Sequence, residues 1–368
     1  MPSSRSPLQC LSALGQSVWI DSLSREWIRG GKLSQLIDED AVVGATSNPT
    51  ILQKAMSSGD AYDKQLRELA GRDTSEVFWT LAEQDIGEAC DVFRPVYDSG
   101  LARDGYVSIE VDPRLAYDSL ASFREAVRLH EVINRPNLLV KIPATKPGLA
   151  AIEDAIAAEH SINVTLIFSL RRYAEVVESY IRGLERLVAE GGDPGKVVSV
   201  ASFFVSRIDT EADRRLDEIG GHEELKGRLA IANAKLAYQH YLQAFSTERW
   251  EYLEGKGATP QRVLWASTST KNPAYPDTLY VDELIGPDTI NTMPLETIEA
   301  FQDHGAPRPT LQSGLARARA TFEELERAGV DYDEVTDTLE REGIEKFEAS
   351  FNELLESLQG KLGSLAHA

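Results

Sequence analysis

The sequence predicts a (β/α)8 TIM barrel, a fold of the α/β class in which eight parallel strands alternate with helices. Eight short apolar runs typical of strands alternate with helical stretches along the 368 residues, and no linker interrupts them. The main alternative, a doubly wound open sheet, would need a glycine-rich phosphate-binding turn after the first strand, and none is present there. We therefore expect a single domain over residues 1–368, with additional helices around the barrel.

Each predicted strand is a run of apolar and β-branched residues bounded by turn residues. The eight runs are 17–23, 41–47, 105–112, 137–145, 161–168, 196–205, 262–267 and 288–293. Helices are predicted over 25–37, 60–72, 74–99, 148–158 and 170–190, with another that ends near residue 134 and a long helical stretch from about 206 to 255. Asn48-Pro49-Thr50 has the character of a helix start, because a capping side chain is followed by proline.

The chain after residue 305 is also predicted to be helical. Apolar residues recur there at helical spacing among many carboxylates: Val335, Leu339, Phe347, Phe351, Leu354 and Leu358. We expect residues 305–368 to form a helical C-terminal extension packed on the barrel. The simplest arrangement places this extension against the outer surface of the barrel, with its carboxylates in solvent.

Composition argues against several classes of partner. The formal charge of −21 would repel nucleic acid and anionic membrane surfaces, although a few local cations could still hold a small phosphate ester. No run of 18 apolar residues is present, so we expect no membrane span. Cys10 and Cys90 lie far apart without metal-ligand spacing, and the histidines avoid the predicted strands. We expect no metal, no other cofactor and a reducing compartment, the cytoplasm.

Lys141 stands in the middle of the predicted strand 137–145, among apolar residues. A desolvated ammonium group is costly, so a lysine in such a place tends to lose its proton. A neutral amine in a dry pocket is what a carbonyl substrate needs in order to form a Schiff base. The alternative is a buried lysine that is paired with a carboxylate for structural reasons only.

Strand parity places several polar side chains beside this lysine. Alternate residues of a barrel strand point inward or pack under the helices, and the helix-covered face must be apolar. The polar positions that alternate with apolar ones are Asp21, Ser108, Glu110, Asp112, Asn163 and Thr165. We expect these side chains to face the barrel interior together with Lys141. A hydrogen-bonded polar plug is the alternative, but barrel interiors are normally filled by branched apolar residues.

Five motifs resemble transaldolase, in the order in which that family carries them. They are Thr46-Ser-Asn-Pro-Thr50, Ser108-Ile-Glu-Val-Asp112, Val140-Lys-Ile-Pro-Ala-Thr145, Ile162-Asn-Val-Thr-Leu166 and Ser202-Phe-Phe-Val-Ser-Arg207. The resemblance covers about residues 15 to 295. It implies a Schiff base on the fourth strand and transfer of a dihydroxyacetone unit from fructose 6-phosphate or sedoheptulose 7-phosphate to erythrose 4-phosphate or glyceraldehyde 3-phosphate. It places this reaction in the non-oxidative pentose phosphate pathway.

The resemblance also implies catalytic roles. Lys141 would attack the C2 ketone, and Asp21 would take the proton of the C4 hydroxyl so that the C3–C4 bond breaks. Glu110 and Thr165 would hold the water that relays protons during loss of the carbinolamine hydroxyl. Two alternatives remain at this stage: Asp21 could cap the helix that follows it, and Glu110 could be only a core partner of Lys141.

Substrate-binding roles follow from the same resemblance. Asn48, Asn163 and Ser202 would bind the hydroxyls of the dihydroxyacetone unit, Phe204 would form a wall of the pocket, and Arg207 would clamp the phosphate. Lys271 would stand where the family usually has a second phosphate-binding arginine. Asn48 could instead be only a helix cap, Phe204 a core residue and Arg207 a surface residue; the parity of Arg207 places it beyond the strand end or after a bulge.

Two other functions compete with transfer. A fructose-6-phosphate aldolase of the same superfamily would release dihydroxyacetone to water, but such enzymes typically have Gln in place of Glu110 and Tyr in place of Phe204. A catalytically silent barrel that acts as a binding module would leave the inward polar residues without a reason to converge. We expect sugar phosphates as the partners of a monomer or homodimer.

Overall fold

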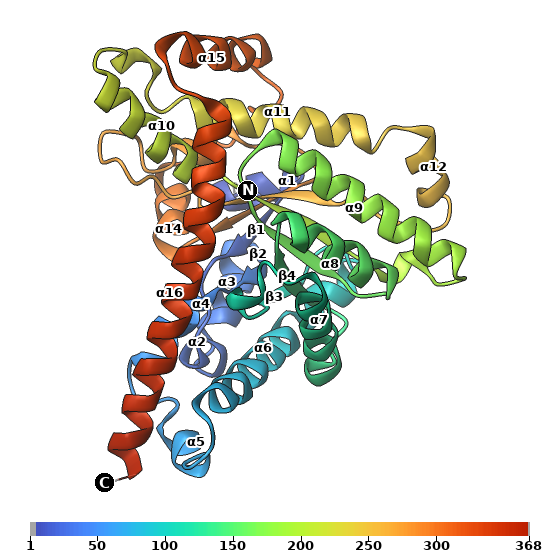
Figure 1. Ribbon diagram of the computed structural model, residues 1–368, viewed down its shortest axis with the longest axis vertical. Helices are drawn as coiled ribbons and strands as arrows, with labels where there is room; N and C mark the ends of the chain where they lie inside the picture. The colour runs from blue at the N-terminus through green and yellow to red at the C-terminus, as the bar shows by residue number, and fades with distance from the viewer. Residues whose placement is uncertain (1–4, 367–368) are drawn as a thin grey trace.

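The computed structural model describes residues 5–366, and its eight parallel strands form a closed barrel. Figure 1 shows the helices that surround these strands. Each strand pairs with the next along the chain, and the last pairs with the first. The strands are β1 (Gln16–Ile20), β2 (Val42–Thr46), β3 (Val107–Glu110), β4 (Leu138–Pro143), β5 (Ile162–Ile167), β6 (Ser199–Phe204), β7 (Arg262–Ala266) and β8 (Thr289–Met293). The predicted fold class is confirmed. Seven strands fall within the predicted runs, and β1 begins one residue before its run, at Gln16.

Helices enclose this barrel. Up to β6 they are α1 (Pro7–Ala13), α2 (Arg25–Arg29), α3 (Lys32–Asp40), α4 (Pro49–Ser57), α5 (Asp63–Glu68), α6 (Thr74–Ser99), the 3-10 turn η1 (Pro113–Leu115), α7 (Ser119–Ile133), α8 (Lys146–Ala157), α9 (Leu170–Ala189) and η2 (Pro194–Lys196). After β6 they are α10 (Ser206–Ile219), η3 (Glu223–Leu225), α11 (Leu229–Ala244), α12 (Glu248–Glu254), α13 (Leu279–Glu283), α14 (Leu295–His304), α15 (Leu315–Ala328) and α16 (Tyr332–Ala366).

Several predicted helices are shorter or broken. The helix predicted over 25–37 is wrong as one piece, because Gly31 adopts a left-handed conformation with φ +83° and starts α3 after α2 has ended. The helix predicted over 60–72 reduces to α5. The stretch from 206 to 255 divides into α10, η3, α11 and α12, and two glycines with positive φ follow the end of α10.

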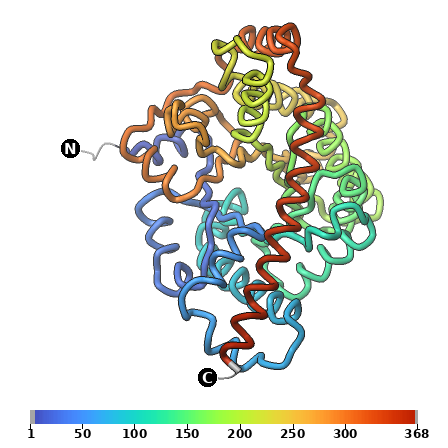
Figure 2. Tube along the Cα trace, turned by 60° about the vertical axis from the view of Figure 1, so that its left-hand side comes forward, coloured from blue at the N-terminus to red at the C-terminus, as the bar shows by residue number. Residues whose placement is uncertain are grey.

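The long C-terminal helix α16 crosses the carboxyl ends of the strands. It contacts α4, α10 and η1, which begin just after β2, β6 and β3, and it also contacts β5. Figure 2 shows this helix in red, running from the top of the molecule to the bottom. The simplest arrangement expected for the extension, packing on the outer surface of the barrel, is therefore wrong. The last two residues of that extension lie outside the described part of the chain.

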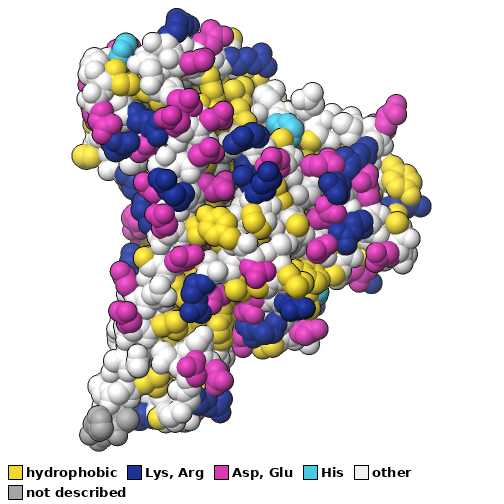
Figure 3. All heavy atoms as spheres, viewed as in Figure 1, with side chains coloured by type: hydrophobic (Ala, Val, Ile, Leu, Met, Phe, Trp, Pro, Cys, Tyr) yellow, Lys and Arg dark blue, Asp and Glu magenta, His cyan; other side chains and the backbone are white. Residues whose placement is uncertain are grey.

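The visible surface mixes charges of both signs with small apolar areas (Figure 3). No helix in the described residues 5–366 combines the length and the apolar character needed to cross a membrane.

Candidate active site

Lys141 lies on β4, with Glu110 of β3 and Asn163 of β5 in register on either side. Its Nζ is 3.1 Å from Glu110 Oε2 and donates a hydrogen bond of 2.9 Å to the backbone carbonyl of Ser47. Lys141 and Glu110 are each only 5% exposed. Burial raises the pKa of Glu110, and the nearby Lys141 ammonium opposes that rise. Lys141 is therefore buried, as the sequence predicted, and it is also paired with a carboxylate, that of Glu110.

Asp21 follows the last residue of β1, and its backbone N–H still donates to the Met293 carbonyl of β8 at 2.8 Å. Its carboxylate accepts a 2.6 Å hydrogen bond from Thr46 Oγ1, which is also 2.7 Å from Thr292 Oγ1. Burial raises the pKa of Asp21. The helix-cap alternative for Asp21 is wrong, because Ser24 caps α2 instead.

Asn163 lies between two hydroxyl side chains. Its Nδ2 donates to Ser108 Oγ at 3.0 Å, and its Oδ1 accepts from Ser202 Oγ at 2.7 Å. Thr165, two residues further along β5, has a buried Oγ1 with no hydrogen-bond partner among residues 5–366. A buried hydroxyl without a partner is costly, so Thr165 is suited to a water or a ligand.

Asn48 and Asp112 illustrate two different outcomes. Asn48 caps α4 by accepting from the Ile51 backbone N–H at 3.0 Å, and it also lines the cavity described below. The prediction that Asp112 faces the barrel interior is wrong, because β3 ends at Glu110 and strand parity does not extend beyond it. The Asp112 side chain instead caps η1 and forms an ion pair with Arg114.

Cationic side chains surround the opening above Lys141. Arg207 is the second residue of α10, beyond the end of β6 as its parity required; its guanidinium lies 5.3 Å from the centre of the Phe204 ring. Its Nη1 is buried with no hydrogen-bond partner among the described residues, and burial lowers the pKa of Arg207. Lys271 is exposed and donates to Ser269 Oγ at 2.6 Å. Burial lowers the pKa of Lys271, and the Glu296 carboxylate opposes this.

These groups share one cavity of about 300 Å³ at the carboxyl ends of the strands. Eight predicted site residues line it: Asp21, Asn48, Lys141, Thr165, Ser202, Phe204, Arg207 and Lys271. Glu110 and Asn163 lie behind this lining, bonded to Lys141 and Ser202. The sequence analysis assigned no role to the other lining residues, which include Thr46, Lys54, Thr292, Glu296 and Phe347. Thr46 lies in a quoted motif, whereas nothing near Phe347 in the sequence indicates a site.

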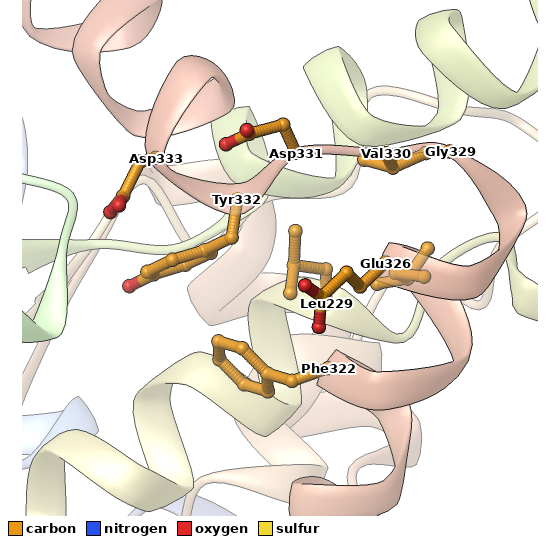
Figure 4. Close-up of a pocket in the computed structure, with 9 residues that line it drawn as sticks. Leu229, Phe322, Glu326, Gly329, Val330, Asp331, Tyr332 and Asp333 are labelled. Atoms are coloured by element: carbon orange, nitrogen blue, oxygen red, sulfur yellow. The ribbon is translucent and has the colours of Figure 1, made fainter.

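A second hollow, of about 410 Å³, lies where α11, α15 and the start of α16 meet (Figure 4). Its lining combines Leu229, Phe322 and Tyr332 with the carboxylates of Glu326, Asp331 and Asp333. None of its nine lining residues is a lysine or an arginine, so it has no amine for a Schiff base and no cation for a phosphate.

Comparisons with known proteins agree on one family. A family model described as Transaldolase/Fructose-6-phosphate aldolase matches residues 18–358. A protein named Transaldolase from Acidothermus cellulolyticus is 53% identical over 352 residues, which are 95% of each chain. A Transaldolase from a Parafrankia species is 52% identical over 365 residues, covering 98% of this chain and 99% of the relative. A protein named Transaldolase 2 from Streptomyces avermitilis is 49% identical over 364 residues, covering 98% of both chains.

Proposed function

Because the chain belongs to the transaldolase/fructose-6-phosphate aldolase family, we propose that it transfers a dihydroxyacetone unit between sugar phosphates through a Schiff base on Lys141. The observation that carries this proposal is the position of one amine. Lys141 is 5% exposed and lines a cavity whose other lining residues include a carboxylate and three cations, Lys54, Arg207 and Lys271. A buried amine in the same cavity as these cations suits a ketone that carries a phosphate at its far end.

The first step is attack of Lys141 Nζ on the C2 ketone, for which the ammonium must first give up a proton. Glu110 Oε2, 3.1 Å from Nζ, is the group in place to take it. The raised pKa makes Glu110 a stronger base for this step, and the proton that it takes up can be returned when the carbinolamine loses water. Thr165, with its unpartnered hydroxyl, would hold the water that relays the proton.

The second step breaks the C3–C4 bond. Asp21 takes the proton of the C4 hydroxyl, C4 becomes the aldehyde carbon of the leaving product, and the bonding electrons pass to the iminium to give an enamine on Lys141. Burial raises the pKa of Asp21, which strengthens it as a base. Addition of an aldose phosphate to the enamine reverses these steps.

Substrate binding divides between the two ends of the cavity. Asn48, Asn163 and Ser202 bind the hydroxyls of the dihydroxyacetone unit, and Phe204 forms the apolar wall. Arg207 binds the phosphate through its guanidinium, with Lys271 as a second, exposed cation. The unpartnered Nη1 of Arg207 supports this assignment, because a phosphate oxygen would satisfy it.

Transfer to an aldose is favoured over release to water by two residues. Glu110 and Phe204 stand where fructose-6-phosphate aldolases typically have Gln and Tyr, as the sequence resemblance implies. We propose that the protein acts as one domain, as a monomer or homodimer, in the cytoplasm and in the non-oxidative pentose phosphate pathway. The free thiols of Cys10 and Cys90 support a reducing compartment.

Borohydride reduction in the presence of fructose 6-phosphate tests the proposal. We expect a three-carbon adduct on the Lys141 peptide by mass spectrometry, and we expect Lys141→Ala to abolish it. An adduct on another lysine, or none, would overturn the proposal. Fructose 6-phosphate with and without erythrose 4-phosphate separates the two enzymes, because only the aldolase would release free dihydroxyacetone continuously without the acceptor.

A further inference from the structure

Phe347 brings the far end of the chain into the catalytic cavity. It lies on α16, is 4% exposed, and is one of the residues that line the cavity around Lys141. The centre of its ring is 5.9 Å from Lys141 Nζ. An aromatic face at this distance attracts a positive charge on that nitrogen, and it also occupies space that water would otherwise fill.

Three contacts made by other residues of α16 hold this helix, and with it the Phe347 ring, in position. Gly343, one turn earlier on α16, packs so closely on the barrel that a Cβ there would lie 3.1 Å from Leu166 Cδ2. Ser350 Oγ accepts a 2.9 Å hydrogen bond from Thr50 Oγ1 of α4. Phe351 packs edge-on against Phe78 of α6, with ring centres 5.2 Å apart. The helix is thus fixed on both sides of Phe347, so the ring is a built part of the cavity.

The docking point on the barrel is itself unusual. Leu166 has a left-handed backbone with φ +58°, and the pairing of β5 with β6 shifts register between Val164 and Ile167. A non-glycine residue in this conformation is uncommon and costs energy, so it persists where surrounding packing fixes it. Leu166 directly follows Thr165, which connects the docking of α16 to the residue assigned to the relay water.

We propose that Phe347 determines whether the enamine on Lys141 is transferred or hydrolysed, by keeping bulk water away from it. This inference rests on the proposed Schiff-base chemistry. After the first aldehyde has left, the enamine must survive until an aldose phosphate enters. Hydrolysis competes: C3 of the enamine takes a proton to give the iminium, water adds to C2, the C2–N bond breaks, and dihydroxyacetone leaves with the free amine restored. Each hydrolysis consumes one water, and exclusion of water slows it.

The test compares the two fates of the enamine in Phe347→Ala. With fructose 6-phosphate and erythrose 4-phosphate, we measure free dihydroxyacetone and sedoheptulose 7-phosphate and take their ratio. We expect the ratio to rise several-fold over the unmodified protein, while the borohydride adduct on Lys141 is still formed. The adduct shows that the amine remains competent, so a changed ratio reports the fate of the enamine rather than its formation.

Phe351→Ala is the matched control, because this buried phenylalanine lies one turn further on α16 and does not line the cavity. We expect its ratio to rise less than that of Phe347→Ala, because the Phe347 ring is still present and the Gly343 and Ser350 contacts still hold the helix. An equal rise in both variants would assign the effect to helix docking and overturn the role of Phe347. Phe347→Leu keeps an apolar side chain at this position and replaces Phe347→Ala in the test if that variant does not fold. We expect its ratio of dihydroxyacetone to sedoheptulose 7-phosphate to exceed that of the unmodified protein, but by less than in Phe347→Ala.

The outcomes separate the inference from its premise. A normal adduct with an unchanged ratio in the Phe347 variants overturns the inference alone. Absence of any adduct in the unmodified protein overturns the proposed function, and the inference with it.

Discussion

Asp21 and Glu110 are both buried carboxyl groups, but they have different neighbours. Glu110 lies beside the amine of Lys141 at 3.1 Å, whereas Asp21 accepts from the hydroxyl of Thr46 at 2.6 Å. Burial raises the pKa of both groups, which makes each carboxylate a stronger base than an exposed one. In the proposed mechanism, Glu110 therefore serves the chemistry at nitrogen and Asp21 the chemistry at C4.

Asp21→Asn separates these two steps. The amide keeps an oxygen for the Thr46 hydrogen bond but is no longer a base, so cleavage of the C3–C4 bond should slow by ~100- to 10,000-fold. Schiff-base formation, which uses Glu110, should continue. Borohydride trapping with fructose 6-phosphate should therefore give a six-carbon rather than a three-carbon adduct on Lys141, measured by peptide mass.

Glu110→Gln is the comparison for that experiment, and it should lower the yield of every adduct because the proton transfer at nitrogen is lost. A three-carbon adduct of normal yield in Asp21→Asn would contradict the assignment of Asp21 as the base for cleavage.

At the scale of elements, α10 and the segment after β7 carry the two cations that bind the phosphate in the proposed function. Arg207 is on α10, and Lys271 is on the segment 267–278. Tyr275 connects the segment 267–278 to α10, because its hydroxyl donates a 2.5 Å hydrogen bond to Asp213 Oδ2 on α10. Tyr280, on α13, makes a similar bond of 2.9 Å to Asp209. Neither tyrosine lines the cavity, so we expect neither to contact the substrate directly.

Tyr275→Phe should loosen the segment that carries Lys271 and weaken phosphate binding. A hydrogen bond to a charged group contributes ~1.5–3 kcal/mol, part of which would appear as a raised KM for fructose 6-phosphate. We expect kcat to change little, because Lys141, Asp21 and Glu110 keep their contacts. Steady-state kinetics with phosphorylated and unphosphorylated fructose measures this, and only the phosphorylated donor should respond.

Tyr280→Phe is the matched variant, since it removes an equivalent hydrogen bond from α13 rather than from the Lys271 segment. Its KM should stay unchanged. A similar loss of affinity for both donors in Tyr275→Phe would show that Tyr275 does not act through the phosphate.

At the scale of the whole molecule, two stacked histidines make stability sensitive to acid. The rings of His130 and His160 are 4.8 Å apart, and His130 Nε2 donates to the Ser161 carbonyl at 2.9 Å. Burial, with a smaller contribution from His160, lowers the pKa of His130 to about 4. The unfolded chain therefore takes up this proton first, and stability falls as the pH drops from about 6.5 towards 4, by up to ~3 kcal/mol.

His130→Gln should remove this contribution to the pH dependence of stability, because the amide can still donate to the Ser161 carbonyl but does not titrate. Urea unfolding at pH 7 and pH 4.5 measures it, and the variant should lose less stability than the unmodified protein between the two values. Equal losses would show that His130 is not protonated on unfolding in this range.

The sequence was sufficient for the barrel and for eight of the residues that line the cavity, because both depend on local patterns. Apolar runs define the strands, and parity places Glu110, Lys141 and Asn163 on neighbouring strands. Other features depend on contacts between distant segments. Parity could not show that β3 ends before Asp112, and helical spacing in the tail could not show that Phe347 faces a cavity rather than ordinary core.

The residues that form the cavity come from both ends of the chain. Every proposed catalytic group lies before residue 208, yet the ring over Lys141 belongs to the final helix, Tyr332–Ala366. A ribosome therefore adds the proposed catalytic side chains first, then the strands β7 and β8 that close the barrel, and last the helix that covers Lys141. A message that stopped near residue 330 would encode all the reactive groups without that covering helix, and proteolytic removal of α16 would have the same effect.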